Sequence, residues 1–237
     1  YTLEVRMKPD LTTFIAACPA DIRSHFQEQT YSFQDKLMEQ NKKSDCIYIL
    51  LNGIVKNYHS EINGNVYIED IETGVTIYGE LEALIDKETV STVEAVTECR
   101  VLKLENAQFL KWLRADNAFT LYITTLIAQR NYDCSKRERV NAFYPLKYRI
   151  MYMIYNTLCK KDLTITKDLL VEGTGSNIRS INRVVNTLIR DGILNYTSGI
   201  ITVHSGREYR KITWCKSTNK SPREKSDFNY PEIISPP

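Results

Sequence analysis

The pattern of apolar residues changes twice along the chain. Residues 11–30 have helical character, and we expect a helix that ends near Thr30. Between residues 31 and 104 short runs rich in β-branched and aromatic residues follow one another, such as CIYILL, NVYIEDI and CRVLKL. Turn signals separate them, and Asn63-Gly64 is the sharpest because both residues tolerate a positive φ. Short strands at regular spacing predict a β-sandwich or barrel.

After residue 104 the apolar residues recur every three or four positions, which indicates helices. Asn106 is predicted to cap a short helix through Leu113, and Asp116 a long helix to about Ala142. A helix of about 25 residues is about 37 Å long, which is more than a small domain needs. We therefore expect part of its apolar stripe to pack against a parallel copy of itself, unless the helix lies across its own barrel. The stripe consists of Phe119, Tyr122, Ile123, Leu126 and Ile127.

Pro145 interrupts the helical pattern. It cannot continue a helix, and it pushes Tyr144 toward an extended conformation, so we interpret Phe143–Pro145 as a hinge between domains. A second helix is expected from Leu146 to about Lys160. Its inward residues are Leu146, Ile150, Met153, Ile154 and Leu158.

The stretch TKDLLVEGTGSNIRSINRVVNTLIRDGIL predicts two helices joined by a glycine-containing turn, which is a helix-turn-helix. Thr166 and Asn177 are positioned to cap the two helices. The next stretch, ILNYTSGIITVHS, predicts a β-hairpin wing. The apolar residues of the second helix are Ile181, Val184, Val185 and Leu188, and its opposite face carries Ile178, Arg179, Asn182 and Arg183.

This polar face has the side chains that read DNA bases. The second helix of such a motif enters the major groove with its N-terminal residues toward the bases. Arginine can make two hydrogen bonds to guanine O6 and N7, and asparagine two to adenine N6 and N7. The alternative is an ordinary helical hairpin with a solvated face. The wing favours DNA binding.

Charge is unevenly distributed, although the net charge is only +2. From Tyr144 onward there are 15 lysines and arginines against 8 acidic residues, a net +7; the preceding part has 16 against 21, a net −5. We infer that only the C-terminal part meets a polyanion. Hydrophobic residues make up 43% and charged residues 25%, which is typical of a foldable soluble protein. No long apolar run or secretory leader is present, so we expect a cytoplasmic protein without membrane contact.

The cysteines and histidines do not form a metal site. Six cysteines lie far apart without a C-x-x-C pair, which favours reduced thiols over a zinc ribbon or an iron–sulfur cluster. Three scattered histidines disfavour a cupin-like metalloenzyme. We therefore expect no metal, no cofactor and no enzymatic activity.

The order β-roll, long helix, hinge, helix, helix-turn-helix and wing resembles the family of the cyclic-AMP receptor protein and the fumarate–nitrate reductase regulator (Crp/Fnr). Three stretches carry the resemblance: the β-roll with the GEL sequence at Gly79–Leu81, the hinge segment NAFYPLKYRIMYMIYNTL, and the helix-turn-helix. GELEALIDKE and AVTECRVLKL are most similar to the YeiL-like subgroup. Arg149 and Arg183 match family arginine positions.

The resemblance implies a fold and a partner. The fold is α+β: a cyclic-nucleotide-binding-type β-roll over 1–115, a dimerisation helix and hinge over 116–143, a winged helix-turn-helix over 144–215 and a polar, partly disordered tail over 216–237. The chain would be a homodimeric bacterial transcription regulator that reads a palindromic DNA operator with half-sites about 34 Å apart. RNA polymerase would be a further partner.

The resemblance also assigns the DNA contacts. Base-reading falls on Arg179 and Arg183, with Ile178 and Asn182 as neighbours. Contacts to phosphates, which set register rather than sequence, fall on Thr166, Lys167, Asn177 and Ser180.

The ligand site of the β-roll departs from the family pattern. Cyclic-nucleotide binders have an Arg-Ser pair where this chain has Thr89-Val90, and no arginine lies between Leu81 and Cys99. A phosphate buried without a cation is poorly compensated, so we do not expect cyclic AMP to be the effector. The alternative function is a ligand-sensing scaffold that does not touch DNA. A pocket for an unknown effector would comprise Gly79, Glu80, Leu81, Thr89, Val90, Cys134 and Ser135.

Overall fold

The computed structural model describes residues 10–158 and 164–203. Contacts divide the chain into two compact units, Tyr1–Asp133 and Cys134–Pro237, which we call the β-roll unit and the winged unit. The boundary falls inside the long helix α5 (Asn117–Phe143). The predicted tail after residue 215, the expected helix end at Lys160 and the side chain of Leu158 lie outside what the structure describes.

Two four-stranded antiparallel sheets form the β-roll, as the sequence predicts. The first sheet has the order β1 (Gln27–Tyr31), β8 (Cys99–Glu105), β3 (Cys46–Asn52) and β6 (Thr76–Tyr78). The second has the order β2 (Lys36–Met38), β7 (Thr92–Ala95), β4 (Ile54–Ser60) and β5 (Val66–Thr73). Asn63-Gly64 lies in the hairpin between β4 and β5, where Gly64 has a φ of 81°.

The expected helix over residues 11–30 is wrong. The structure has α1 (Leu11–Ala17) and α2 (Ala20–Arg23), followed by strand β1. Pro19 ends the first helix because it has no N–H to donate, and its φ suits the start of the second. Strand β1 pairs with β8 at the sheet edge, and its mostly exposed side chains give no alternating apolar signal.

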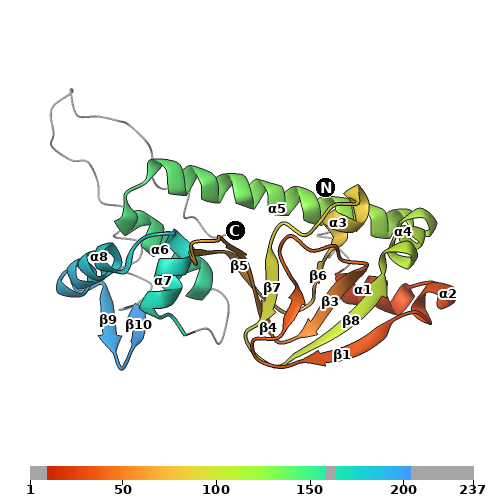
Figure 1. Cartoon of the computed structure of the whole chain (residues 1–237), viewed down its shortest axis with the longest axis horizontal. Coiled ribbons are helices and arrows are strands. Elements are labelled where there is room, and N and C mark those ends of the chain that lie inside the picture. The colour runs from red at the N-terminus through yellow and green to blue at the C-terminus, as the bar shows by residue number, and fades with distance from the viewer. Residues whose placement is uncertain (1–9, 159–163, 204–237) are drawn as a thin grey trace, which may run out of the picture. The chain divides into compact units, whose positions relative to one another are not determined.

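Three further helices pack on the β-roll: α3 (Glu80–Ile85), α4 (Asn106–Ala115) and the first part of α5 (Figure 1). Asp116 caps α5 as predicted, because its carboxylate accepts from the N–H groups of Ala118 and Phe119. Asn106 does not cap α4. It is the first helical residue, and its amide donates to the carbonyl of Ser44 at 2.8 Å.

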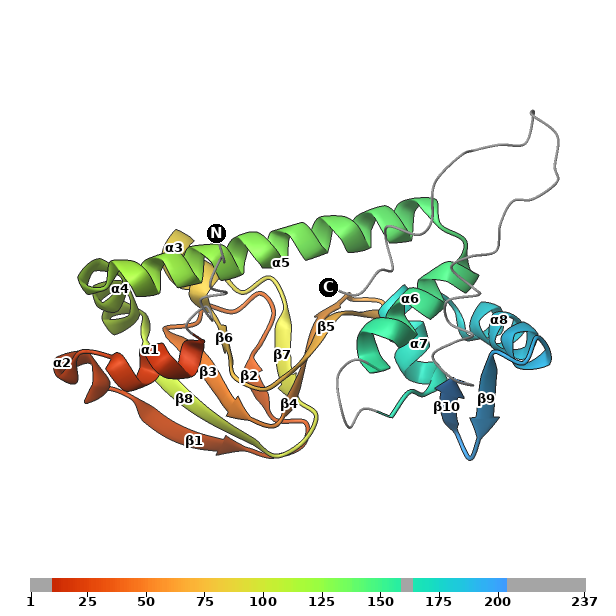
Figure 2. The ribbon, with the colours of Figure 1, turned by 180° about the vertical axis from the view of Figure 1, so that it is seen from behind.

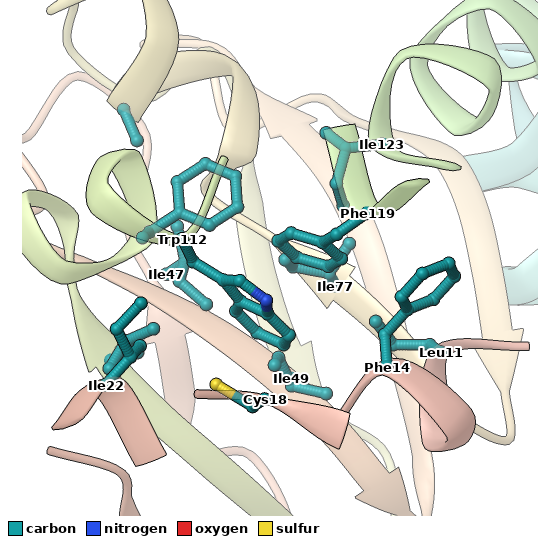
Figure 3. Close-up of a cluster of buried hydrophobic side chains, with 13 residues drawn as sticks. Leu11, Phe14, Cys18, Ile22, Ile47, Ile49, Ile77, Trp112, Phe119 and Ile123 are labelled. Atoms are coloured by element: carbon teal, nitrogen blue, oxygen red, sulfur yellow. The ribbon is translucent and has the colours of Figure 1, made fainter. Parts of the chain in front are cut away.

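A dense aromatic cluster joins these helices to the first sheet (Figure 3). The Trp112 ring of α4 stacks on the Phe119 ring of α5, with centroids 3.7 Å apart and planes 14° from parallel. Phe14 of α1 lies against Phe119, with a centroid distance of 5.6 Å, and Cys18 is buried in the same cluster. The first part of α5 is therefore built into the core of the β-roll unit.

After the end of α5, the described part of the winged unit has three helices and a hairpin (Figure 2). Its elements are α6 (Leu146–Leu158), α7 (Lys167–Thr174), α8 (Ile178–Arg190), β9 (Leu194–Thr197) and β10 (Ile200–Val203). Helix α5 ends at Phe143 and α6 begins at Leu146, so the helical structure is interrupted around Pro145 as predicted. The core of the unit consists of Ile150, Met151, Ile154, Ile165, Leu170, Ile181, Val185, Leu188, Leu194 and Ile201.

Candidate nucleic-acid interface and effector site

Side-chain caps fix the starts of α7 and α8. The Thr166 hydroxyl accepts from the N–H of Leu169 at 3.1 Å, and the Asn177 carbonyl oxygen accepts from the N–H of Ser180 at 2.9 Å. Gly175 adopts the left-handed conformation that ends α7, with a φ of 60°. Both predicted caps are confirmed.

Arg149 of α6 holds the turn between α7 and α8. Its Nη1 donates to the carbonyl of Thr174 at 3.2 Å, and its Nη2 donates to the hydroxyl of Ser176 at 3.3 Å. The resemblance matched this arginine to an arginine position of the family pattern, but it did not predict which residues the arginine contacts. The structure shows that it ties the first helix of the unit to the helix-turn-helix.

Helix α8 separates its two faces as the spacing predicts. Ile181, Val185 and Leu188 are fully buried. On the other face Arg179 and Arg183 are exposed, Ile178 is 43% exposed and Asn182 is half-buried. Neither arginine side chain has a hydrogen bond or ion pair to any residue that the structure describes, so both guanidinium groups can meet a ligand.

The four residues predicted to contact phosphates lie at the helix starts. Thr166 caps α7 and Lys167 is its first residue, whereas Asn177 caps α8 and Ser180 is its third residue. Lys167 has a neighbour that the sequence did not reveal: its Nζ lies 4.1 Å from the centroid of the Tyr196 ring of β9.

In the β-roll unit, Gly79 and Glu80 form a sharp strand-to-helix turn. Gly79 has a φ of 85°, and a Cβ here would meet the carbonyl oxygen of Cys46 at 3.0 Å, so glycine is required. This turn directs Glu80 inward, where it is 2% exposed. Burial raises the pKa of the Glu80 carboxyl, and the nearby Arg130 only partly offsets this.

Arg130 of α5 supplies a cation that the sequence did not predict. Its Nη1 lies 2.6 Å from a carboxylate oxygen of Glu80. Its Nη2 donates to the hydroxyl of Thr76 at 3.0 Å and to the carbonyl of Ile77 at 2.9 Å. The guanidinium also lies 5.3 Å from the Tyr78 ring centroid. Its position on a helix distant in sequence from the loop after Glu80 explains why the sequence pattern did not indicate it.

The other predicted pocket residues of the β-roll unit, Leu81, Thr89 and Val90, have surroundings different from those of Glu80. The buried Thr89 hydroxyl donates to the backbone carbonyls of Glu39 and Lys42, so it fastens its loop to a turn. Leu81 and Val90 are 40% and 62% exposed. The remaining two predicted residues, Cys134 and Ser135, belong to the winged unit.

The predicted dimer stripe needs correction. Phe119 and Ile123 are at most 1% exposed, because they fill the core of their own β-roll unit; Tyr122, Leu126 and Ile127 pack against the same core. The prediction that Phe119 and Ile123 contact a second copy is therefore wrong. The alternative, a helix lying across its own barrel, describes this stripe. A different row, spaced four, three and four residues apart, is exposed: Leu121, Thr125, Ala128 and Tyr132.

Comparison with known proteins agrees with the observed fold. Residues 28–116 match the family model of the cyclic nucleotide-binding domain. A Crp/Fnr-family transcriptional regulator from Eubacterium rectale superposes with a TM-score of 0.72 at 13% identity, covering 84% of this chain and 96% of that one. The chain has the fold of the Crp/Fnr regulators. The c-di-GMP-responsive global regulator CLP from Xanthomonas campestris shares this Crp/Fnr fold at a TM-score of 0.70 and 16% identity, covering 77% of this chain and 95% of that one.

Curated relatives are distant and much longer. Lysophospholipase nte1 from Emericella nidulans is 24% identical over 174 residues, which cover 72% of this chain and 11% of that protein. The Aspergillus niger lysophospholipase nte1 is 28% identical over 98 residues, covering 41% of this chain and 6% of that protein. This chain therefore spans about a tenth or less of the curated relatives it matches. Among the residues that the structure describes, no helix has the length and apolar character to cross a membrane.

Proposed function

We propose that the chain is a sequence-specific DNA-binding transcription regulator that acts as a homodimer in the cytoplasm. The observation that carries the proposal is the exposed N-terminal half of α8. There Arg179 and Arg183 extend from a helix whose other face is locked into the core. The Crp/Fnr fold supports the same reading, because regulators of this family bind DNA.

In this proposal α8 enters the major groove. Arg179 and Arg183 read guanine edges, Asn182 is positioned for adenine, and Ile178 offers an apolar contact such as a thymine methyl group. Phosphate contacts come from the starts of α7 and α8 and fix the register. The residues assigned to them are Thr166, Lys167, Asn177 and Ser180.

The exposed row on α5 is the proposed dimer contact. Leu121 is 68% exposed, and Thr125 and Ala128 follow at the four- and three-residue spacing of a coiled-coil seam. Small side chains in such a seam allow two helices to approach closely. A two-fold dimer would place two α8 helices on a palindrome with half-sites about 34 Å apart. RNA polymerase is the proposed further partner of the assembled complex.

The β-roll is proposed not to respond to cyclic AMP. Glu80, the residue that would receive a ribose, is already bonded to Arg130. Thr89 and Val90 offer no cation to a phosphate, and the Thr89 hydroxyl is engaged by backbone carbonyls. A nucleotide would have to break a buried ion pair and would meet no replacement charge from the loop. Any effector is therefore a molecule of different chemistry.

Selection from random DNA duplexes tests the proposal directly. The purified protein is incubated with the pool at a stated salt concentration without ligand, and the bound fraction is sequenced. We expect an enriched palindrome. The double variant R179E/R183E is the matched control, and it should lose the enrichment while it keeps the oligomeric state of the wild type. Random sequence in the bound pool, from a dimer confirmed in solution and in the presence of candidate effectors, would reject DNA reading.

A second function is favoured by the matches to lysophospholipase nte1, which cover 72% of this chain in one case. In that reading the β-roll is a ligand-sensing or scaffold module of a larger protein, and α8 has a solvated polar face. The same selection separates the two functions, because a scaffold module predicts that R179E/R183E behaves as the wild type does with every duplex.

A further inference from the structure

Lys167 and Tyr196 form a surface pair in the winged unit. The Lys167 Nζ lies 4.1 Å from the centroid of the Tyr196 ring, a distance at which an ammonium is attracted to the negative face of an aromatic ring. Lys167 is half-buried and Tyr196 is 41% exposed, so the pair lies at the surface. It also lies at the start of α7, beside the Thr166 cap.

The hairpin is fastened so that this ring must face α7. Tyr196 pairs directly with Ile201 across the hairpin, and cross-strand partners point to the same face. Ile201 is 2% exposed within the core of the unit. Its N–H donates to the carbonyl of Ile165 at 2.8 Å, two residues before Lys167. The backbone bond and the buried isoleucine together fix where the Tyr196 ring lies.

The lysine is held by a neutral group. No ion pair of Lys167 exists with any other residue in the described ranges, so its charge is available to an anion. A lysine has a long flexible stem, and ordering it costs conformational entropy when it binds. Contact with the ring restricts the ammonium beforehand without neutralising it.

We propose that Tyr196 is a positioning residue that holds the Lys167 ammonium for one DNA phosphate. The hairpin would then increase the affinity for DNA indirectly, by positioning a lysine of α7. This inference rests on the proposed DNA-binding function and adds a defined role for a residue outside the helix-turn-helix. Because a phosphate carries no sequence information, the effect falls equally on operator and random duplexes.

Four variants and one control test the pair: Y196F, Y196L, K167A, K167A/Y196L, and T202A on the opposite face of the hairpin. Affinity for an operator and for a random duplex is measured over a range of salt concentrations. K167A should weaken both complexes about five- to tenfold and lower the salt slope by about one. Y196L should weaken both about two- to fivefold. Y196F, which keeps the ring, and T202A should bind as the wild type does.

The double variant and the free protein distinguish positioning from direct contact. K167A/Y196L should bind no more weakly than K167A, because the ring acts only through the lysine. In the NMR spectrum of the free protein, Y196L should remove the ring-current shift of the Lys167 side-chain methylenes, and Y196F should keep it.

Several outcomes overturn the inference. They are wild-type affinity in Y196L, a further loss in the double variant, or a loss in Y196F equal to that in Y196L. Wild-type protein that binds duplexes normally, with K167A indistinguishable from it, rejects the inference alone. Wild-type protein that binds no duplex rejects the proposed function together with it.

Discussion

Arg130 in the β-roll unit and Arg183 in the winged unit have opposite surroundings. Arg130 is held by a buried carboxylate, a hydroxyl and a backbone carbonyl. Arg183 is exposed, and its guanidinium group has no partner among the described residues. An arginine whose donors are satisfied inside a protein stabilises structure, whereas one that is left open can select a partner. The difference gives Arg130 a structural role and supports the proposed recognition role of α8.

The two faces of α5 extend this comparison and give the largest expected effect. Phe119 stacks on Trp112 in the core, so F119A should lower the free energy of unfolding by about 3–5 kcal/mol in urea titrations. Ala128 is exposed on the opposite row, so A128E should leave the fold intact and shift the oligomeric state toward the monomer. Light scattering measures this shift. A stable F119A protein, or an A128E protein that unfolds, would reverse the assignment of the two faces.

The next effect concerns Arg130, whose guanidinium group is paired with Glu80. R130Q removes one partner of a buried ion pair and leaves Glu80 uncompensated, so we expect a loss of about 2–3 kcal/mol in the free energy of unfolding. The double variant E80Q/R130Q should recover part of this loss, because no buried charge remains. Thermal and urea unfolding measure both. If the double variant were less stable than R130Q, the pair would not be coupled in this way.

Substitution of the exposed Arg183 is expected to have a smaller effect, which appears only in DNA binding. R183A should cost about 1–3 kcal/mol in binding the selected operator and should relax the preference at one base. R190A, an exposed arginine at the other end of α8, is the control and should leave sequence preference unchanged. An equal loss of affinity on operator and random duplexes would make Arg183 a phosphate contact instead.

The smallest expected effect is a pH dependence of stability that arises from His59, which pairs with Glu69 in the β-roll unit. A hydrogen bond to Glu69 raises the pKa of the His59 imidazole above its ordinary value of 6.5. The stability this contributes is fully present below pH 6.5 and is lost as pH rises through the raised pKa. H59Q should remove that dependence, with a difference below about 1 kcal/mol because the pair is part-exposed. Unfolding titrations at a series of pH values measure it.

The sequence was sufficient where a local signal matched a local structure. Thr166, Asn177 and Asp116 cap their helices because each is a good N-cap residue ahead of an apolar period. The α8 faces follow from three- and four-residue spacing, and the wing follows from its glycine turn. The two-sheet β-roll likewise follows from short strands separated by turns.

The sequence was insufficient where partners are distant along the chain. Spacing identifies the apolar stripe of α5 but not which surface covers it, so Phe119 and Ile123 were assigned to a dimer contact. The same limit hid the Glu80–Arg130 pair, which joins residues from two helices. Strand β1 was missed because an edge strand with exposed side chains has no apolar alternation. The contact between Lys167 and Tyr196 also depends on tertiary packing.

Burial of the cysteines has a consequence for chemical reactivity. Burial raises the pKa of the Cys18 thiol to about 11, and it also raises the pKa values of Cys46 and Cys99. At neutral pH only about one Cys18 side chain in ten thousand is then the reactive thiolate. Alkylating reagents can modify Cys18 and Cys99 rapidly only when the β-roll unit opens. The rate of labelling at Cys18 and Cys99 therefore reports opening of this unit without an engineered probe.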